Sequence, residues 1–296
     1  MPNKNTDIFL DEEFLRKLEH LKLMAQQGIQ GSRRGEYSSW HAGTSLEFLD
    51  YRKYQLGDDL RYVDWNVYGR LNKLFIKLFR AEKNQTVHIL LDMSLSMKTG
   101  NPPKHICAKK IAAALCYICL ANLNQAGITV LTDSLGPARP PARGRQVYLS
   151  VVDFLAKLEP GNKTDLNACL SEYASACKQP GIAVILSDLL DPGGIEKGLR
   201  ALRYSRFDTS IIQVLDHEEL FPDLEGNLIL KDVETGEIKQ VIPDRNLLEA
   251  YQRKIQGLIE TVRNICRQTG IDYHLFDTKI PFEDFLINYI TRGTLF

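Results

Sequence analysis

The last two thirds of the chain alternate between short apolar runs and longer segments with helical periodicity. The first run, TVHILLD at 86–92, is almost continuously apolar, which is typical of a strand covered on both faces. Similar runs follow at 128–132, 181–188, 209–216 and 271–278. Amphipathic or apolar helical patterns lie between them, at 102–124, 164–177, 194–204, 243–269 and 281–292. This alternation predicts an α/β fold with a doubly wound, mostly parallel sheet flanked by helices.

Three segments interrupt this rhythm. GPARPPARGRQ at 136–146 is rich in proline and arginine, and we interpret it as a solvated loop. The next segment, at 147–158, indicates a short strand that turns into a helix. NLILKDVETGEIKQV at 227–241 predicts a hairpin insertion that turns at Glu234–Gly236.

The first 83 residues follow another pattern. Residues 11–30 predict an amphipathic helix, because apolar residues recur there near a 3.6-residue period. Residues 32–83 are aromatic, partly alternating and broken by glycines, which predicts strands and turns. We therefore expect two parts: an N-terminal helix with a β-rich appendage at 1–83, and the α/β domain at 84–296.

Composition narrows the function classes. Lys+Arg and Asp+Glu both number 37, so the net charge is zero, which argues against nucleic acid as a partner. The N-terminus has no apolar signal segment. Residues 111–132 carry no charge, and a buried helix followed by a strand explains them better than a membrane span.

The six cysteines suggest no disulfide framework, so we expect a cytoplasmic protein. Cys116 and Cys119 form a CxxC pair that we interpret as core packing, with a redox pair as the alternative.

Oxygen-bearing side chains collect where the predicted strands end. Asp92 ends the first strand of the sheet, and Ser94 and Ser96 follow on the next loop. Thr164 stands at the start of a predicted helix, and Asp188 ends another buried strand. Ligands bind outside the carboxyl ends of strands in such sheets, so we expect these five residues to converge on one edge.

Two carboxylates and three hydroxyls make a hard-oxygen set without imidazole or thiolate. Such sets suit Mg²⁺, and also Mn²⁺ or Ca²⁺. Each residue alone has an ordinary explanation, since Asp, Ser and Thr also cap helices and begin turns. Their order along the chain, strand-end Asp, helix-start Thr and strand-end Asp, favours a metal site over three unrelated caps.

These motifs resemble those of a known family. Asp92-x-Ser94-x-Ser96, Thr164 and Asp188 resemble the metal-ion-dependent adhesion site of von Willebrand factor A domains. The match is closer to one bacterial branch, the domain of unknown function 58 family. The further motifs that carry it are EFLDYRKYQLGDDLRYVDWNVYGRLNKLFIKLFRAE at 47–82, Met97, TDL at 164–166, SDLLDP at 187–192 and DVETGE at 232–237. The resemblance covers about residues 30–290.

The resemblance implies a von Willebrand factor A (Rossmann-like) fold and a non-enzymatic, Mg²⁺-dependent protein-binding module. Ser94, Ser96 and Thr164 would contact the ion, while Asp92 and Asp188 would act mainly through waters. A partner's Asp or Glu would complete the coordination. The family is associated with MoxR-type AAA+ ATPases, so the expected partner is such an ATPase or its client, with the chain as adaptor or co-chaperone. Asp165 would support the start of the helix.

Other interpretations stay open. A strand-end Asp on an α/β sheet with Mg²⁺ also begins a class of phosphohydrolases, in which Asp92 would be the nucleophile. That class needs an acid two residues later, where this chain has Ser94, and no catalytic lysine is obvious beside Asp188. A structural scaffold with a vestigial metal site is a third possibility.

Two further features have alternative interpretations. GDDLRYVDW at 57–65 is interpreted as an internal network of arginine and carboxylates with Trp65 as a packing anchor. Its alternative is a docking site or a second cation site. His88 lies in a predicted strand and is interpreted as a core residue.

Overall fold

The computed structural model describes residues 9, 11–32, 46–55, 58–81, 85–161, 163–191, 193–222, 228–231, 238–241 and 244–291. The chain divides into two compact units, one of residues 1–34 and 85–296 and the other of residues 35–84. Each is described by itself.

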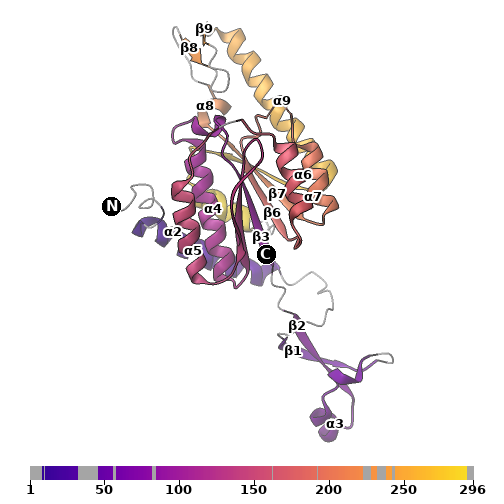
Figure 1. Ribbon diagram of the computed structural model, residues 1–296. Helices are drawn as coiled ribbons and strands as arrows, with labels where there is room; N and C mark the ends of the chain where they lie inside the picture. Colours follow the sequence, from indigo (N-terminus) through magenta and orange to yellow (C-terminus); the bar gives the residue numbers. More distant parts are fainter. Residues whose placement is uncertain are drawn as a thin grey trace. The chain divides into compact units, whose positions relative to one another are not determined.

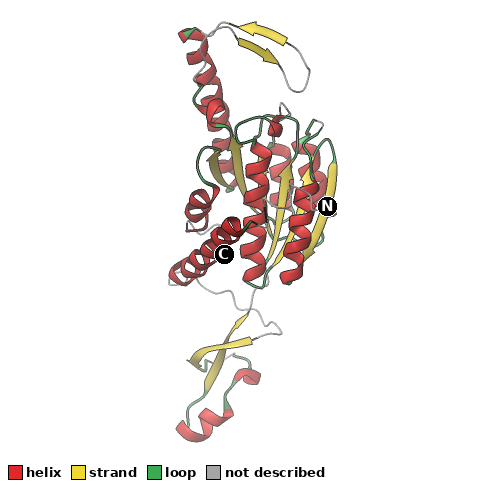
Figure 2. Cartoon of the chain, turned by 90° about the vertical axis from the view of Figure 1, so that its left-hand side faces the viewer, coloured by secondary structure: helices red, strands yellow, loops and turns green. Residues whose placement is uncertain are grey.

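The larger unit is built on a six-stranded sheet with the order β10-β7-β6-β3-β4-β5 (Figures 1 and 2). All neighbouring strands are parallel except β4 and β5, which are antiparallel. The expected doubly wound, mostly parallel sheet is therefore confirmed. Its strands are β3 (Thr86–Asp92), β4 (Gln125–Leu131), β5 (Leu135–Ala142), β6 (Ile182–Ser187), β7 (Asp208–Leu215) and β10 (Asp272–Asp277).

Helices cover both faces of the sheet (Figure 1). One core cluster joins the sheet to the helices α2 (Glu12–Ser32), α4 (Lys104–Ala121), α5 (Arg145–Lys157) and α10 (Phe282–Thr291). The other joins it to α6 (Leu166–Ala176), α7 (Glu196–Tyr204) and α9 (Arg245–Thr269). Ile89 and Leu91 of β3 belong to the first cluster and Leu90 to the second, because successive side chains of a strand point to opposite faces. The continuous apolar run of β3 follows from this double coverage.

The N-terminal helix belongs to this larger unit. The sequence-based division placed it with the appendage at 1–83, but α2 packs against α4 and α10. Leu18 and Leu21 of α2 are fully buried in the first core cluster. The N-terminal helix is therefore part of the α/β unit, and the appendage consists of residues 35–84 alone.

Two further expectations, about the segments at 136–146 and 147–158, were wrong. The proline- and arginine-rich segment is the edge strand β5 and not a loop. An edge strand tolerates proline, since one side of its backbone needs no ladder hydrogen bonds. A Cβ at Gly127 of β4 would lie 2.7 Å from the nitrogen of Pro141, so the glycine makes room for this strand.

The segment at 147–158 contains no strand. It is helical from Arg145 to Lys157, with Val151, Val152 and Leu155 buried on one face.

The remaining elements of the larger unit are short. The 3-10 turn η2 (Ser96–Lys98) follows β3, and α8 (His217–Leu220) follows β7. The strands β8 (Leu228–Lys231) and β9 (Ile238–Val241) pair antiparallel, as the hairpin pattern predicted. The expected turn at Glu234–Gly236 lies outside the described residues. Among the helices that the structure describes, none combines the length and apolar character needed to cross a membrane.

The smaller unit contains an antiparallel pair, β1 (Leu46–Lys53) and β2 (Phe75–Ala81), with the 3-10 turn η1 (Leu60–Tyr62) and helix α3 (Trp65–Leu71) between them. The strands were expected, whereas α3 was not. Asp64 starts α3 by accepting the backbone N–H groups of Asn66 and Val67.

The interpretation of GDDLRYVDW is confirmed only in part. Arg52 pairs with Asp58 in a partly buried contact, as an internal arginine–carboxylate network requires, whereas the Arg61–Asp59 pair is exposed to solvent. The buried acid, Asp64, instead pairs with Lys77 at 3.0 Å. Trp65 is 60% exposed, so its interpretation as a packing anchor was wrong. Its ring contacts that of Tyr68 edge to face.

Candidate metal site

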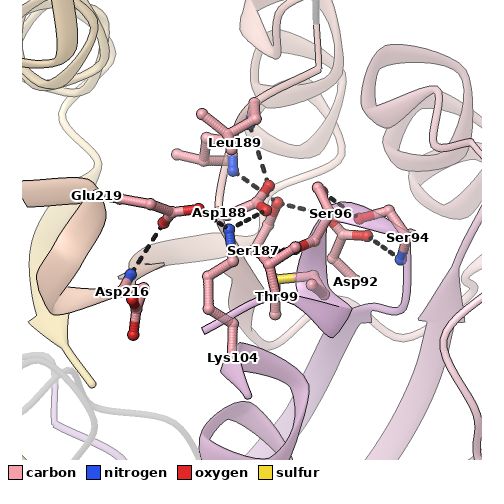
Figure 3. A network of polar contacts seen from close by, with 12 residues as sticks. Asp92, Ser94, Ser96, Thr99, Lys104, Ser187, Asp188, Leu189, Asp216 and Glu219 are labelled. Carbon is pink, nitrogen blue, oxygen red and sulfur yellow. Dashed lines mark hydrogen bonds and ion pairs between the residues drawn. The ribbon is translucent and has the colours of Figure 1, made fainter. Parts of the chain in front are cut away.

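The candidate site is built around the carboxylate of Asp92, at the end of the central strand β3. Asp92 is 2% exposed, and its Oδ1 accepts the backbone N–H of Ser94 at 2.9 Å. On the loop that follows the strand, the Oγ atoms of Ser94 and Ser96 lie 2.9 Å apart (Figure 3). The turn η2 then fixes the loop, where the Thr99 hydroxyl donates to the Ser96 carbonyl.

Two more segments reach the same carboxylate. The Thr164 hydroxyl donates to Oδ1 of Asp92 at 3.0 Å, and the Ser187 hydroxyl donates to Oδ2 at 2.5 Å. Thr164 precedes α6, and Ser187 is the last residue of β6. The structure therefore brings the serine loop, the start of α6 and the end of β6 together around one buried acid.

Asp188 lies beside this group, directly after β6, and is 1% exposed. Its Oδ1 accepts the backbone N–H of Leu190, and its Oδ2 accepts the Lys104 ammonium at 2.9 Å. Burial first, and then the nearby Asp188 charge, raise the pKa of Asp92 above the usual value of an aspartate. A negative charge on Asp92 is therefore costly here unless a cation lies close by.

Lys104 is one of the residues that the sequence interpretation missed. It lies in the first turn of α4, is completely buried, and also donates to Glu219 of α8 at 2.6 Å (Figure 3). Burial lowers the pKa of Lys104, but Asp188 and Glu219 together outweigh it and leave the pKa raised. No catalytic lysine beside Asp188 was obvious from the sequence, and the structure places Lys104 there in an ion pair with Asp188.

Signals for the missed residues exist in the sequence. A lysine is unfavourable in the first turn of a helix, where the dipole favours acids, so Lys104 at the head of an apolar helix indicates a nearby carboxylate. Ser187 directly precedes the strand-end Asp188 and could have been added to the set for that reason. Nothing in the sequence indicates that Glu219 would reach this edge.

Two aspartates hold the start of α6 in place. Asp165 accepts the N–H of Ala168 at 2.8 Å and caps the helix, as expected. Asp191, on the loop after β6, accepts the N–H of Leu166 at 2.9 Å. The second contact ties the loop that follows Asp188 to the helix that follows Thr164, and so fixes these two residues relative to each other.

The hydroxyl geometry fits a small divalent cation. Two neighbouring ligands of an octahedral Mg²⁺ lie about 3 Å apart, because each metal–oxygen distance is about 2.1 Å. The oxygen pair of Ser94 and Ser96, at 2.9 Å, matches this spacing. Across the residues that the structure describes, no three His, Cys, Asp or Glu side chains form a metal-binding group. A cation at this edge would therefore depend on the hydroxyls for much of its coordination.

The CxxC pair lies away from this edge. Cys116 and Cys119 are buried in α4, and all six cysteines are free thiols. Burial raises the pKa of Cys116 well above the usual value, and that of Cys119 to about 12. Thiols kept protonated in this way are poor nucleophiles, which supports core packing over a redox pair.

A family model described as "Protein of unknown function DUF58" matches residues 50–257, a span that contains all five predicted site residues. The chain belongs to this family. The uncharacterized protein Rv1480 of Mycobacterium tuberculosis is 28% identical over 250 residues, which cover 82% of this chain and 78% of Rv1480. The DUF58 family suggested by the motifs is thus confirmed.

Solved structures of low sequence identity resemble this DUF58 chain. One is an aerotolerance-related membrane protein from Bacteroides fragilis, with a TM-score of 0.46 and 17% identity, covering 71% of this chain and 98% of that one. Another is the SpRpn10 VWA domain, with a TM-score of 0.39 and 12% identity, covering 71% of this chain and 97% of that one.

Proposed function

We propose that this DUF58 protein is a divalent-metal-dependent protein-binding module that catalyses no reaction itself. The observation that carries the proposal is the convergence on Asp92. Hydroxyls from the start of α6 and the end of β6 donate to its carboxylate, and the Ser94–Ser96 pair lies on the adjoining loop. The set combines buried carboxylates with neutral hydroxyls, and the Ser94 and Ser96 hydroxyls lie at the spacing of octahedral ligands.

Each residue has a role in this proposal. Ser94, Ser96 and Thr164 offer neutral oxygen ligands, and Asp92 and Asp188 hold water molecules in the next shell. A bound Mg²⁺, or Mn²⁺ or Ca²⁺ in its place, would supply a Lewis acid able to accept a carboxylate oxygen. The neutral hydroxyls leave positive charge uncompensated, which favours a partner that presents Asp or Glu.

The partner proposed is a protein and not a nucleic acid, because the chain has equal numbers of acidic and basic residues. The family resemblance favours a MoxR-type AAA+ ATPase or its client, with this chain as adaptor or co-chaperone. The six free thiols agree with a reducing compartment, and we propose the cytoplasm.

Calorimetry with Mg²⁺ on metal-free protein tests the metal site. We expect binding by the wild type, and loss of binding in Asp92→Asn, which keeps the size of the side chain but removes its charge. Ser96→Ala is the milder variant, because the Ser96 hydroxyl contacts the Ser94 hydroxyl and the change adds no buried charge. Equal binding by wild type and both variants would reject the site.

A pull-down tests the proposed interaction. The immobilised chain should retain a MoxR-type ATPase or its client in Mg²⁺ and release it in EDTA, and Ser96→Ala should retain less. Retention that survives both EDTA and Ser96→Ala would favour a scaffold with a vestigial metal site.

One observation favours a second candidate, a metal-dependent phosphohydrolase. Lys104 lies 2.9 Å from Asp188, beside a strand-end Asp92, as such chemistry would require. However, three donors already occupy both oxygens of Asp92, and Ser94 stands where a general acid is needed. A phosphatase screen with Mg²⁺ separates the candidates: turnover that Asp92→Asn abolishes would establish the enzyme and overturn our proposal.

A further inference from the structure

Lys104 connects the candidate metal site to the end of the neighbouring strand. Its ammonium donates to Asp188 at 2.9 Å and to Glu219 at 2.6 Å (Figure 3). No part of the Lys104 side chain reaches solvent. Glu219 in turn accepts the N–H of Asp216 and completes the capping box of α8. A positive charge is thus built into the fold beside Asp188, which is one of the five predicted site residues.

The surroundings of Lys104 hold the ammonium firmly in this position. The Asp216 carboxylate accepts the Thr278 hydroxyl at 2.7 Å and the N–H of Asn101 at 3.3 Å. The second of these contacts ties α8 to the segment that leads into α4. Since Lys104 starts α4 and Glu219 belongs to α8, the two partners of the ion pair are fixed by the same local packing.

The charges in this network determine the local potential. Asp188 and Glu219 contribute two negative charges and Lys104 one positive charge, so the three together carry one negative charge. Without Lys104 they would carry two, and without Glu219 they would carry none. Each change alters the attraction for a divalent cation in a known direction.

We propose that Lys104 sets the affinity of the metal site, by sharing Asp188 with any bound cation and keeping the cation weakly held until an acidic partner adds its own carboxylate. Lys104 is then a positioning and affinity-setting residue and not a ligand. This inference rests on the proposed function, because it presumes that the site binds a divalent cation.

Four variants test the inference by Mg²⁺ calorimetry on EDTA-treated full-length chain, with folding checked by circular dichroism. Lys104→Met should bind more tightly than wild type and Glu219→Gln more weakly. Each change should be about ten- to hundredfold, for a unit charge roughly 6 Å from a divalent ion at an effective dielectric constant of about 40 to 80. The double variant Lys104→Met/Glu219→Gln restores the net charge and should bind within about threefold of wild type.

Lys109→Met is the matched control. Lys109 is also a buried lysine of α4, but it donates to the Leu158 carbonyl and not to the site. Its loss should leave Mg²⁺ affinity almost unchanged. Amide exchange in EDTA gives a second readout that needs no metal: residues 217–220 should exchange faster in Lys104→Met than in Lys109→Met, because α8 loses its ion pair.

The outcomes distinguish a failure of the role inferred for Lys104 from a failure of the proposed metal-dependent function. Weaker Mg²⁺ binding in both Lys104→Met and Glu219→Gln would indicate a purely structural ion pair and overturn the inference while leaving the metal site intact. Unchanged affinity in both would also overturn it. If Lys104→Met does not fold, Glu219→Gln and the double variant still show whether Mg²⁺ affinity changes in the direction that the charges predict. An absence of binding in the wild type and every variant would overturn the proposed function.

Discussion

The Thr164 hydroxyl lies 3.0 Å from Oδ1 of Asp92, although 72 positions separate the two residues along the chain. Asp92 ends β3 and Thr164 precedes α6, so neither residue depends on the other for its local conformation. The contact exists because parallel strands end at one edge and their crossover segments return to that edge. Burial removes water from the Asp92 carboxylate, and three hydrogen-bond donors replace that water: the Ser94 N–H and the hydroxyls of Thr164 and Ser187.

Thr164→Ala should weaken Mg²⁺ binding by at least about tenfold, because it removes a neutral oxygen at the candidate site. Thr164→Ser restores the hydroxyl and should recover most of the affinity. The measurement is calorimetric titration of metal-free protein. Equal affinity of the alanine and serine variants would place Thr164 outside the coordination, as a hydrogen-bond donor to Asp92 alone.

Most of the candidate site could be predicted from the sequence, because short segments of sequence are enough to place its residues at one edge of the sheet. The apolar runs identify the strands, and the residue that ends each run must lie at the edge where ligands bind. Asp92 and Asp188 are such residues, and Ser94 and Ser96 are too close to Asp92 to lie elsewhere. Thr164 required one more step, the start of a crossover helix.

The rest depended on packing between distant elements. Lys104 meets Glu219 because α4 and α8 approach each other, and no periodicity indicates that approach. The edge strand β5 was hidden by prolines, which normally mark loops but are tolerated where a strand has one free side. The assignment of α2 to the larger unit likewise depends on its contact with α4 and α10, which the composition of the N-terminal region does not reveal.

Asp191→Ala should lower both stability and metal affinity. The change removes the acceptor of the Leu166 N–H, which should cost about 1–2 kcal/mol in the free energy of unfolding. It also frees the loop after Asp188 from the start of α6, so Mg²⁺ should bind more weakly. Denaturant unfolding and calorimetry measure the two effects.

Asp165→Ala is the matched control for this prediction, because Asp165 caps the same helix through the Ala168 N–H, a hydrogen bond that does not involve that loop. It should lower stability by a similar amount and leave Mg²⁺ affinity near that of wild type. A comparable loss of affinity in both variants would show that any loosening of α6 disturbs the site, and would remove the special role given to Asp191.

His88 should make the fold sensitive to mild acid. It is 1% exposed, its Nδ1 lies 2.7 Å from the Tyr173 hydroxyl, and burial lowers its pKa. A histidine with a lowered pKa contributes stability that is present above its unfolded pKa of about 6.5 and is lost as the pH falls through the folded pKa. The loss should approach about 1.4 kcal/mol per pH unit below 6.5.

Denaturant unfolding at pH 7 and pH 5 measures this effect. His88→Gln should lose less stability than wild type between the two values, whereas His20→Gln, at an exposed position of α2, should follow the wild type. Parallel losses in wild type and His88→Gln would assign the acid sensitivity to other groups.

The buried thiols of α4 should resist modification in the folded protein. Cys116 and Cys119 are at most 1% exposed, and the Cys119 thiol donates to the Gln125 carbonyl, whereas Cys177 at the end of α6 is partly exposed. Since reactivity requires an accessible thiolate, iodoacetamide should modify Cys177 first and the CxxC pair only on unfolding. Peptide mass spectrometry after timed native alkylation gives the order. Rapid labelling of Cys116 or Cys119, or a disulfide between them after mild oxidation, would contradict core packing and restore the redox pair as the better interpretation.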